Sequence, residues 1–315
     1  MIFRRRLKRM TACLLFFTIF TLPCAYSRAS SNTIIVVVKS RSIGPYMEVA
    51  ETFKRSMEAY DYNIKIVEFD LVGESMPQDL KNNINEAKPQ LIFSLGTPAT
   101  KASRQAFAET GLTVVYAMVL NPAASNIIPP GVSMDIPFEL KLKELKRILP
   151  QAKRIGVIYS PEYSEVFNAV SQAARNTGLE VSGRQINGQK EFSEAMLDVF
   201  GEIDCFLMIA DPSTYLPKTT EHLLLEALQR KIPVVGLSSA YTKAGALLAF
   251  DCDYTDLGRQ AAELVIKIVS GKAGSPPEMT APRKMKFSLN LKVAERLGIN
   301  IPQEMISEAG EVFGR

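Results

Sequence analysis

The amino-acid sequence predicts an α/β fold made of two lobes, each a doubly wound parallel sheet, which are joined by a hinge. Short β-branched runs alternate with longer amphipathic stretches, the pattern of repeated βα units. Runs such as IIVVV and CFLMIA are apolar at every position, which indicates strands buried on both faces of a parallel sheet. The alternation also starts twice, so we expect two sheets of similar size.

The first series of strands ends around Leu120, and the second begins at Arg154 after a Pro-rich bridge near Pro122–Asp135. The predicted strands are Thr33–Lys39, Asn63–Phe69, Gln90–Leu95, Thr113–Met118, Arg154–Tyr159, Glu180–Gln185, Asp204–Ile209, Pro233–Leu237, Ala246–Phe250 and Met285–Leu289. The helical segments between them include Tyr46–Tyr60, Gln78–Ala87, Ala99–Ala108, Phe138–Leu149, Glu165–Thr177, Thr219–Gln229 and Asp256–Ser270.

Ligands of open α/β sheets bind beyond the carboxyl ends of the strands, so the residues that follow each strand are the candidate site. These tips are rich in Ser, Thr, Asn, Asp and Tyr: Ser40–Gly44, Gly96–Pro98, Met118–Pro122, Ser160–Ser164, Asp211–Tyr215, Ser238–Tyr241 and Asp251–Tyr254. Each of them taken singly is also an ordinary turn or helix cap. Because two such sheets facing each other form a cleft, the set as a whole favours ligand binding.

The turn Gly96-Thr97-Pro98 is the strongest single feature of these tips. Thr97 is a favoured N-cap and Pro98 a favoured first helical residue, while Gly96 permits a tight turn. Free N–H groups and the positive end of the helix dipole would then point at one place, which suits a carboxylate or another anion. This turn therefore predicts an anion-binding wall of the cleft.

Acceptors for a ligand ammonium group are expected across the cleft, at Asp211, Asp251 and Asp253. The chain has no Trp, so tyrosines are the natural residues for stacking on a ligand ring. The tyrosines at the tips are Tyr163, Tyr215 and Tyr241.

The first 29 residues have the order of a secretory signal peptide. A basic cluster precedes thirteen mostly apolar residues, Met10–Leu22, and small residues after Pro23 allow cleavage after Ser27 or Ala29. The apolar segment is shorter than the roughly 20 residues of a membrane span. We expect export to the periplasm with removal of residues 1–29, the alternative being a retained anchor.

Removal of this segment changes the charge and the cysteine content. Six of the 37 Lys and Arg residues and none of the 33 Asp and Glu residues lie in 1–29, which leaves 31 basic residues and a formal charge of −2. No nucleic-acid-binding surface is therefore expected. The remaining cysteines, Cys205 and Cys252, fall at opposite ends of predicted parallel strands, too far apart for the disulfide that an oxidising compartment would permit.

No catalytic constellation is found. His222 is the single histidine and lies inside a helical segment, and the serines at 238 and 239 have no histidine partner in the pattern. Nucleophile-elbow, phosphate-loop and dinucleotide motifs are absent from the sequence, as is any Cys/His spacing for a metal. The sequence thus predicts a binding protein with no catalytic residues, metal or cofactor, the alternative of a hydrolase on this scaffold being disfavoured.

Several stretches, spread over nearly all of the chain after residue 29, resemble one family. They are PQLIFSLGTPATKA, VVYAMVLNPAASNI, LKELKRILPQAKRIGVIYSPEYSE, KIPVVGLSSAYTKAGALLAFDCDYTDLGRQAAELVIKIVSGK and FSLNLKVAERLGINIPQEMISEAGEV. Their order and the combination of GALLAF, DYTDLGRQAAE and NLKVAERLGINIP resemble ABC-transporter substrate-binding proteins of the tryptophan/tyrosine-type group, which have the type I periplasmic-binding-protein fold.

The resemblance implies discontinuous lobes. Residues 30–131 with 252–283 would form the N-terminal lobe, and residues 132–251 with 284–315 the C-terminal lobe. The chain would cross near Gly131–Asp135, Asp251–Tyr254 and Arg283–Leu289. The helix Asp256–Ser270 would then return to the first lobe, and Asn290–Gly310 would pack on the second.

The resemblance also implies a monomeric protein that captures a small molecule, such as an amino acid or related small anion, and delivers it to an ABC permease. The ligand-contact residues that it implies are Gly96, Thr97, Pro98, Met118, Asn121, Tyr163, Asp211, Ser213, Thr214 and Ser238. The sequence departs from relatives that carry an acidic residue near Ser238, and Pro212 replaces a common Asn. A periplasmic ligand-sensing partner of a membrane signalling receptor is the alternative function.

Overall fold

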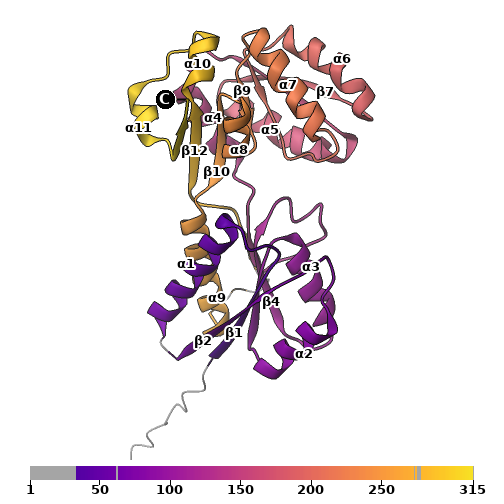
Figure 1. Cartoon of the computed structure of the whole chain (residues 1–315), viewed down its shortest axis with the longest axis vertical. Helices are drawn as coiled ribbons and strands as arrows, with labels where there is room; N and C mark the ends of the chain where they lie inside the picture. The colour runs from indigo at the N-terminus through magenta and orange to yellow at the C-terminus, as the bar shows by residue number, and fades with distance from the viewer. Residues whose placement is uncertain (1–32, 62, 273, 275–277, 315) are drawn as a thin grey trace, which may run out of the picture. The chain divides into compact units, whose positions relative to one another are not determined.

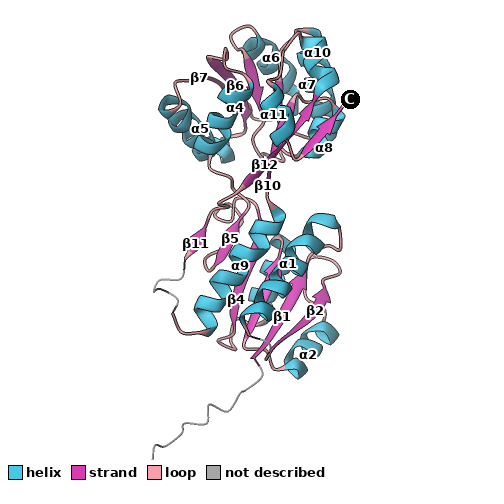
Figure 2. Cartoon of the chain, turned by 90° about the vertical axis from the view of Figure 1, so that its left-hand side faces the viewer, coloured by secondary structure: helices cyan, strands magenta, loops and turns pink. Residues whose placement is uncertain are grey.

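Two mostly parallel sheets with helices on their faces carry the fold (Figures 1 and 2). The computed structural model describes residues 33–314 except 62, 273 and 275–277, and these residues belong to one compact unit. The predicted signal peptide, residues 1–29, lies outside the described residues. None of the helices in the described ranges is both long and apolar enough to cross a membrane.

The first sheet has the strand order β11-β5-β4-β3-β1-β2, and each neighbouring pair is parallel. Its strands are β1 (Thr33–Lys39), β2 (Ile64–Asp70), β3 (Leu91–Leu95), β4 (Thr113–Val119), β5 (Gly131–Ser133) and β11 (Met279–Thr280). The chain reverses its direction of winding between β1 and β3, so the carboxyl ends of these two strands form the switch point where ligands of doubly wound sheets bind.

The second sheet has the order β13-β12-β10-β9-β8-β6-β7, with its switch point between β6 and β8. Its strands are β6 (Arg154–Tyr159), β7 (Glu180–Gln185), β8 (Cys205–Leu207), β9 (Val234–Gly236), β10 (Leu248–Cys252), β12 (Met285–Asn290) and β13 (Glu311–Phe313). Strand β12 runs antiparallel to β10, which corrects the prediction of an entirely parallel sheet. The chain re-enters the sheet at the edge where β10 ended, pairing Met285 with Cys252, so β12 must run the other way.

The helices follow the predicted alternation. They are α1 (Gly44–Tyr60), α2 (Gln78–Ala87), α3 (Thr97–Ala106), α4 (Phe138–Ile148), α5 (Ser164–Asn176), α6 (Gln189–Phe200), α7 (Pro217–Gln229), α8 (Ser239–Ala244), α9 (Tyr254–Val269), α10 (Leu291–Leu297) and α11 (Gln303–Glu308). A short 3-10 turn, η1 (Pro161–Tyr163), precedes α5.

Both faces of the first sheet are buried, as its apolar strands predicted. Ile35 and Val37 of β1 point to one face and pack with α1 and α9, whereas Val36 and Val38 point to the other and pack with α2 and α3. This alternation is the two-residue period of a strand. Figure 1 shows α1 and α9 side by side on one face and α2 and α3 on the other.

Cys205 and Cys252 lie at opposite ends of two parallel strands of the second sheet, β8 and β10, which are separated by β9. Cys205 begins β8 and Cys252 ends β10, and both thiols are buried and free. The strand predicted over Ala246–Phe250 is thus displaced by two residues, so that Cys252 pairs within the sheet instead of following it.

Among the described residues, the chain passes between the two sheets in three segments. These passes lie between β5 and α4, between β10 and α9, and between β11 and β12. Helix α9 thereby follows a strand of the second sheet but packs against α1 on the first (Figure 2). We retain the predicted lobe boundaries as a proposal that this path supports.

The contact between α1 and α9 generates a stability prediction. A Cβ added at Gly258 of α9 would lie 2.6 Å from the carbonyl oxygen of Val49 and 3.2 Å from the amide nitrogen of Phe53, both backbone atoms of α1. Gly258→Ala should lower the free energy of unfolding by about 1–3 kcal/mol through overpacking, despite the better helix propensity of Ala.

Chemical denaturation of the purified protein measures this effect. Gly44→Ala is the control, because a Cβ at Gly44 meets no atom within 4 Å. A Gly258→Ala variant as stable as the wild type would show that the two helices separate without cost.

Candidate functional site

The switch point of the first sheet is closed by Ser40, which follows β1. Its N–H donates to the carbonyl of Leu95 at 2.9 Å, and its Oγ accepts a hydrogen bond from the N–H of Ala99 at 2.9 Å. One serine therefore ties the tip of β1 both to the end of β3 and to the first turn of α3.

The Gly96 turn differs from its prediction in detail. Helix α3 begins at Thr97, with Gly96 as the flanking residue and no side-chain cap, so the prediction of Thr97 as N-cap is wrong. Gly96 has φ of +91°, and a Cβ there would lie 2.7 Å from the Oγ of Ser40 and 2.8 Å from the hydroxyl of Tyr46. Because Ser40 already satisfies the N–H of Ala99, the helix start offers fewer free donors than the sequence indicates.

The tip of β4 contains two non-glycine residues in the left-handed region. Met118 has φ of +60° beside a register shift between β4 and β5, and Asn121 has φ of +42°. The N–H of Asn121 donates to both carboxylate oxygens of Asp135, at 2.9 and 3.1 Å. Burial raises the pKa of Asp135, although this hydrogen bond and the charge of Lys141 oppose the shift.

Asp211 holds the corresponding switch point of the second sheet. Its carboxylate accepts five hydrogen bonds: from the N–H of Ser160 at 2.7 Å, from the N–H and hydroxyl of Ser213 at 3.0 and 2.6 Å, and from the N–H and hydroxyl of Thr214 at 3.2 and 2.8 Å. Asp211 is 1% exposed. Burial opposes its ionisation, but the hydrogen bonds outweigh that effect and keep the pKa of Asp211 below its ordinary value.

The other acidic tip residues also have partners within the protein. Asp251 accepts from the N–H of Ser239 at 2.8 Å and from the hydroxyl of Tyr254 at 3.2 Å. Asp253 caps α9 by accepting from the N–H of Asp256 at 3.0 Å. The carboxylates expected to receive a ligand ammonium group are therefore engaged in holding strand tips and a helix start.

A cavity of about 410 Å³ lies among the tips that follow β4, β6, β8 and β9. Its lining residues are Leu120, Asn121, Ala124, Ser125, Tyr163, Ala210, Asp211, Pro212, Tyr215, Leu237 and Tyr241. The structure thus brings together three of the predicted ligand-contact residues: Asn121, Tyr163 and Asp211. The others do not line this cavity, and ligand contact at Gly96, Thr97, Pro98, Met118, Ser213, Thr214 and Ser238 stays a prediction.

Aromatic rings and one amide determine the chemistry of the cavity. Burial, and then the charges of Asp211 and Glu162, raise the pKa of Tyr163, so its phenol is protonated at neutral pH. The hydroxyl of Tyr215 donates to the carbonyl of Ile158 at 2.7 Å. Because this bond engages the hydroxyl, Tyr215 contributes its ring to the cavity wall. The Oδ1 of Asn121 accepts from the N–H of Ala124 at 3.3 Å, and within the described residues the amide nitrogen of Asn121 has no protein partner.

Several lining residues lie next to predicted ones. Tyr215 and Tyr241 belong to the tips that sequence reasoning singled out for ring stacking, but the contact set omitted them. Ala124 and Ser125 were missed because they lie in the Pro-rich bridge, where no strand end marks a tip. The left-handed turn at Asn121 brings them back beside it, as the bond from the N–H of Ser125 to the carbonyl of Asn121 at 3.3 Å shows.

Comparisons with known proteins agree with this architecture. A "Tyrosine-binding protein" of Clostridioides difficile is 26% identical over 252 residues, which are 72% of this chain and 69% of that protein. Two solved structures share the fold. A ligand-free, open substrate-binding protein with adhesive properties from Clostridium difficile has a TM-score of 0.72 at 21% identity and covers 90% of this chain and 100% of its own.

The second solved structure is an ABC domain in complex with L-Trp from Streptococcus pneumonia. It has a TM-score of 0.60 at 20% identity, with 90% of this chain and 100% of its own covered. The family model described as "ABC transporter substrate binding protein" matches residues 34–313. The chain, with its two α/β sheets and its cavity at their strand tips, therefore belongs to the ABC transporter substrate-binding protein family.

Proposed function

We propose that this protein is exported, captures a small solute in the cavity at the strand tips and delivers it to an ABC permease. The observation that carries the proposal is the cavity itself, because it lies at the switch point of the second sheet and includes the tip of β4 from the first. Its volume of about 410 Å³ is in the range of small-molecule sites. Capture by closure of the two lobes would use the three connecting segments as the hinge.

The ligand that we propose is an aromatic amino acid or a closely related small anion. The tyrosine-binding relative and the L-Trp complex support this class. The rings of Tyr163, Tyr215 and Tyr241, with Leu237 and Pro212, provide apolar and stacking surface for an aromatic ring.

The polar side of the site favours the ligand's carboxylate over its ammonium group. The amide nitrogen of Asn121 is a donor with no protein partner in the described chain, whereas Asp211, the one carboxylate among the lining residues, is saturated by five donors. The remaining predicted contacts, Gly96 and Ser213 among them, would then shape the tips that present these groups.

Asn121→Gly tests the site directly. Glycine keeps the left-handed backbone of Asn121 and removes its amide donor, so the affinity for L-tyrosine or L-tryptophan should fall about tenfold or more, measured by calorimetry. Asn126→Gly is a matched control, because Asn126 has φ of +54°, is exposed and does not line the cavity. Equal affinities of the two variants would remove Asn121 from the site.

A ligand series tests which charged group is recognised. 3-(4-Hydroxyphenyl)propanoate, which lacks only the amine of L-tyrosine, should bind within about tenfold of L-tyrosine, because its missing ammonium group had no free carboxylate to pair with. L-Tyrosinamide, which keeps the ammonium group but lacks the carboxylate, should lose more. The reverse order in calorimetry would mean that a carboxylate of the protein does receive the amine.

Asp211→Asn separates the scaffold role of Asp211 from ligand binding. The amide cannot accept all five hydrogen bonds, so we expect a loss of about 1–3 kcal/mol in the free energy of unfolding at neutral pH. A lowered folded-state pKa stabilises the fold above the unfolded value near 4, and that contribution is lost as the pH falls through the folded value. The difference from wild type should therefore shrink below about pH 4.

Thermal unfolding across this pH range is the measurement. Glu162→Gln is the control, because it removes a carboxylate from an exposed position next to Tyr163. A gap between Asp211→Asn and wild type that stays constant down to pH 2 would contradict the assignment.

A further inference from the structure

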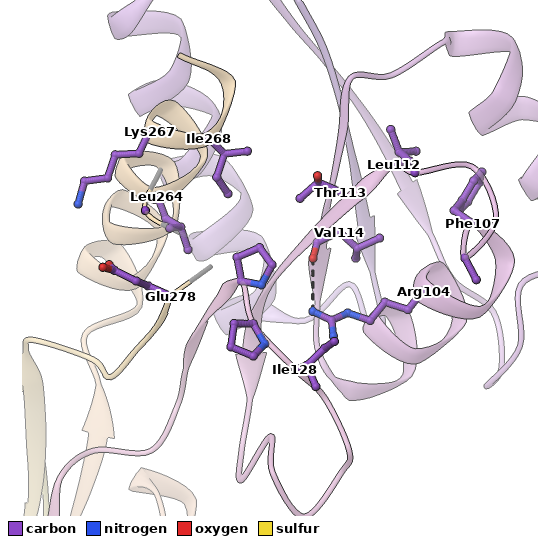
Figure 3. Close-up of a pocket in the computed structure, with 15 residues that line it drawn as sticks. Arg104, Phe107, Leu112, Thr113, Val114, Ile128, Leu264, Lys267, Ile268 and Glu278 are labelled. Carbon is purple, nitrogen blue, oxygen red and sulfur yellow. Dashed lines mark hydrogen bonds between the residues drawn. The ribbon is translucent and has the colours of Figure 1, made fainter. Parts of the chain in front are cut away.

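We propose that a second cavity, on the first sheet and separate from the strand-tip cavity, binds a small amphipathic carboxylate: an apolar chain or ring that carries a single anionic head. Its volume is about 520 Å³, and it shares no lining residue with the cavity at the strand tips. It is formed at the end of α3, the start of β4 and the last turns of α9 (Figure 3).

Most of the wall is apolar. Phe107 and Leu112 come from the segment after α3, Val114 from β4, Ile128 from the Pro-rich bridge, and Leu264 and Ile268 from α9. Ile128 is 68% exposed, so one apolar lining residue is also open to solvent. A wall of this kind gains free energy by burying a hydrocarbon chain or ring.

Arg104 supplies a cation in this apolar wall. Figure 3 shows its guanidinium extending toward Val114 and Ile128, and its Nη2 donates to the carbonyl of Val114 at 3.4 Å, a long hydrogen bond. Arg104 is half-buried, and its guanidinium lies 5.7 Å from the ring centroid of Tyr116, within the range of a cation–π contact. In the described part of the chain, the bond to Val114 is the one side-chain hydrogen bond found for Arg104, which also lines the cavity.

Arg104 is one of three charged residues that line the cavity, with Lys267 and Glu278, and in the part of the chain that is described no carboxylate lies within 4.0 Å of its guanidinium. Ion pairs within 4.0 Å are found there for other arginines, such as Arg147 and Arg283, but Arg104 makes none. Glu278 lines the cavity on the side of α9, across from Arg104 (Figure 3). Burial raises the pKa of Tyr116 to about 12, although the charge of Arg104 opposes this, so its phenol is neutral.

These observations select the ligand class. Desolvation lowers the pKa of Arg104, the sign of a cation whose surroundings do not compensate its charge. A carboxylate accepts two parallel hydrogen bonds from a guanidinium. The apolar tail of such a ligand would lie in the cavity between Val114 and Leu264. A neutral apolar molecule would leave the guanidinium uncompensated, and a small inorganic anion would leave the wall empty.

Titration calorimetry with octanoate on the purified protein tests the proposal. Octanoate should bind the wild type, 1-octanol should bind at least about tenfold more weakly because it lacks the charge, and acetate should not bind measurably. Arg104→Gln should weaken octanoate binding about tenfold or more. Lys101→Gln is the matched control, because it removes the same charge from an exposed position on the same helix.

A second pair of variants covers the case in which Arg104→Gln unfolds. Ile128→Glu places a negative charge at an exposed lining residue and should weaken octanoate binding, whereas Val72→Glu, at a side chain that is 82% exposed elsewhere, should not. Asn121→Gly should leave octanoate binding unchanged, which separates this cavity from the site of the proposed function. Undetectable octanoate binding, equal affinity for 1-octanol, or weakening by Asn121→Gly but not by Arg104→Gln would overturn the proposal.

Discussion

The strand tips of both sheets are held by side chains that accept hydrogen bonds from backbone N–H groups of a neighbouring tip. The same device recurs at four places. The pairs, acceptor first, are Ser40 and Ala99, Asp135 and Asn121, Asp211 and Ser160, and Asp251 and Ser239. A backbone N–H that loses its partner on burial costs about 1–3 kcal/mol, so these side chains stabilise the strand tips, among them the tips that line the strand-tip cavity.

This use of the tip residues determines what remains for a ligand. The oxygens that the sequence presents as ligand acceptors, above all those of Asp211, are consumed by the scaffold. The other residues that line the cavity contribute tyrosine rings, short apolar side chains and the amide of Asn121. Under the proposed function, such a cavity would recognise its ligand by ring contact and by donation to an anion. Recognition of an ammonium group would need an acceptor that the described tips already use.

The sequence predicted the layers of this fold well because burial on two faces leaves a strong pattern. Continuous apolar runs and helical periodicity revealed the doubled βα series, and the tips followed from the strand ends. Single-residue backbone conformations carry no such pattern. Met118 and Asn121 have positive φ angles next to a register shift between β4 and β5, and the turn at Asn121 brings Ser125 back beside it. The cavity around Arg104 could not be predicted from the sequence either, since its wall joins segments more than a hundred residues apart.

The three segments that connect the two sheets are held by hydrogen bonds and ion pairs of their own. The second and third segments are bonded to each other: the N–H of Asp253 donates to the carbonyl of Lys284 at 3.3 Å, and Arg283 pairs with Asp256 at 2.8 Å. The first segment carries Asp135, whose carboxylate reaches the turn at Asn121 in the cavity wall. A rotation of the backbone around Asp135 would therefore act on a turn that lines the strand-tip cavity. If the protein closes about these segments, as proposed, this bond would link the hinge to the site through one hydrogen-bonded carboxylate.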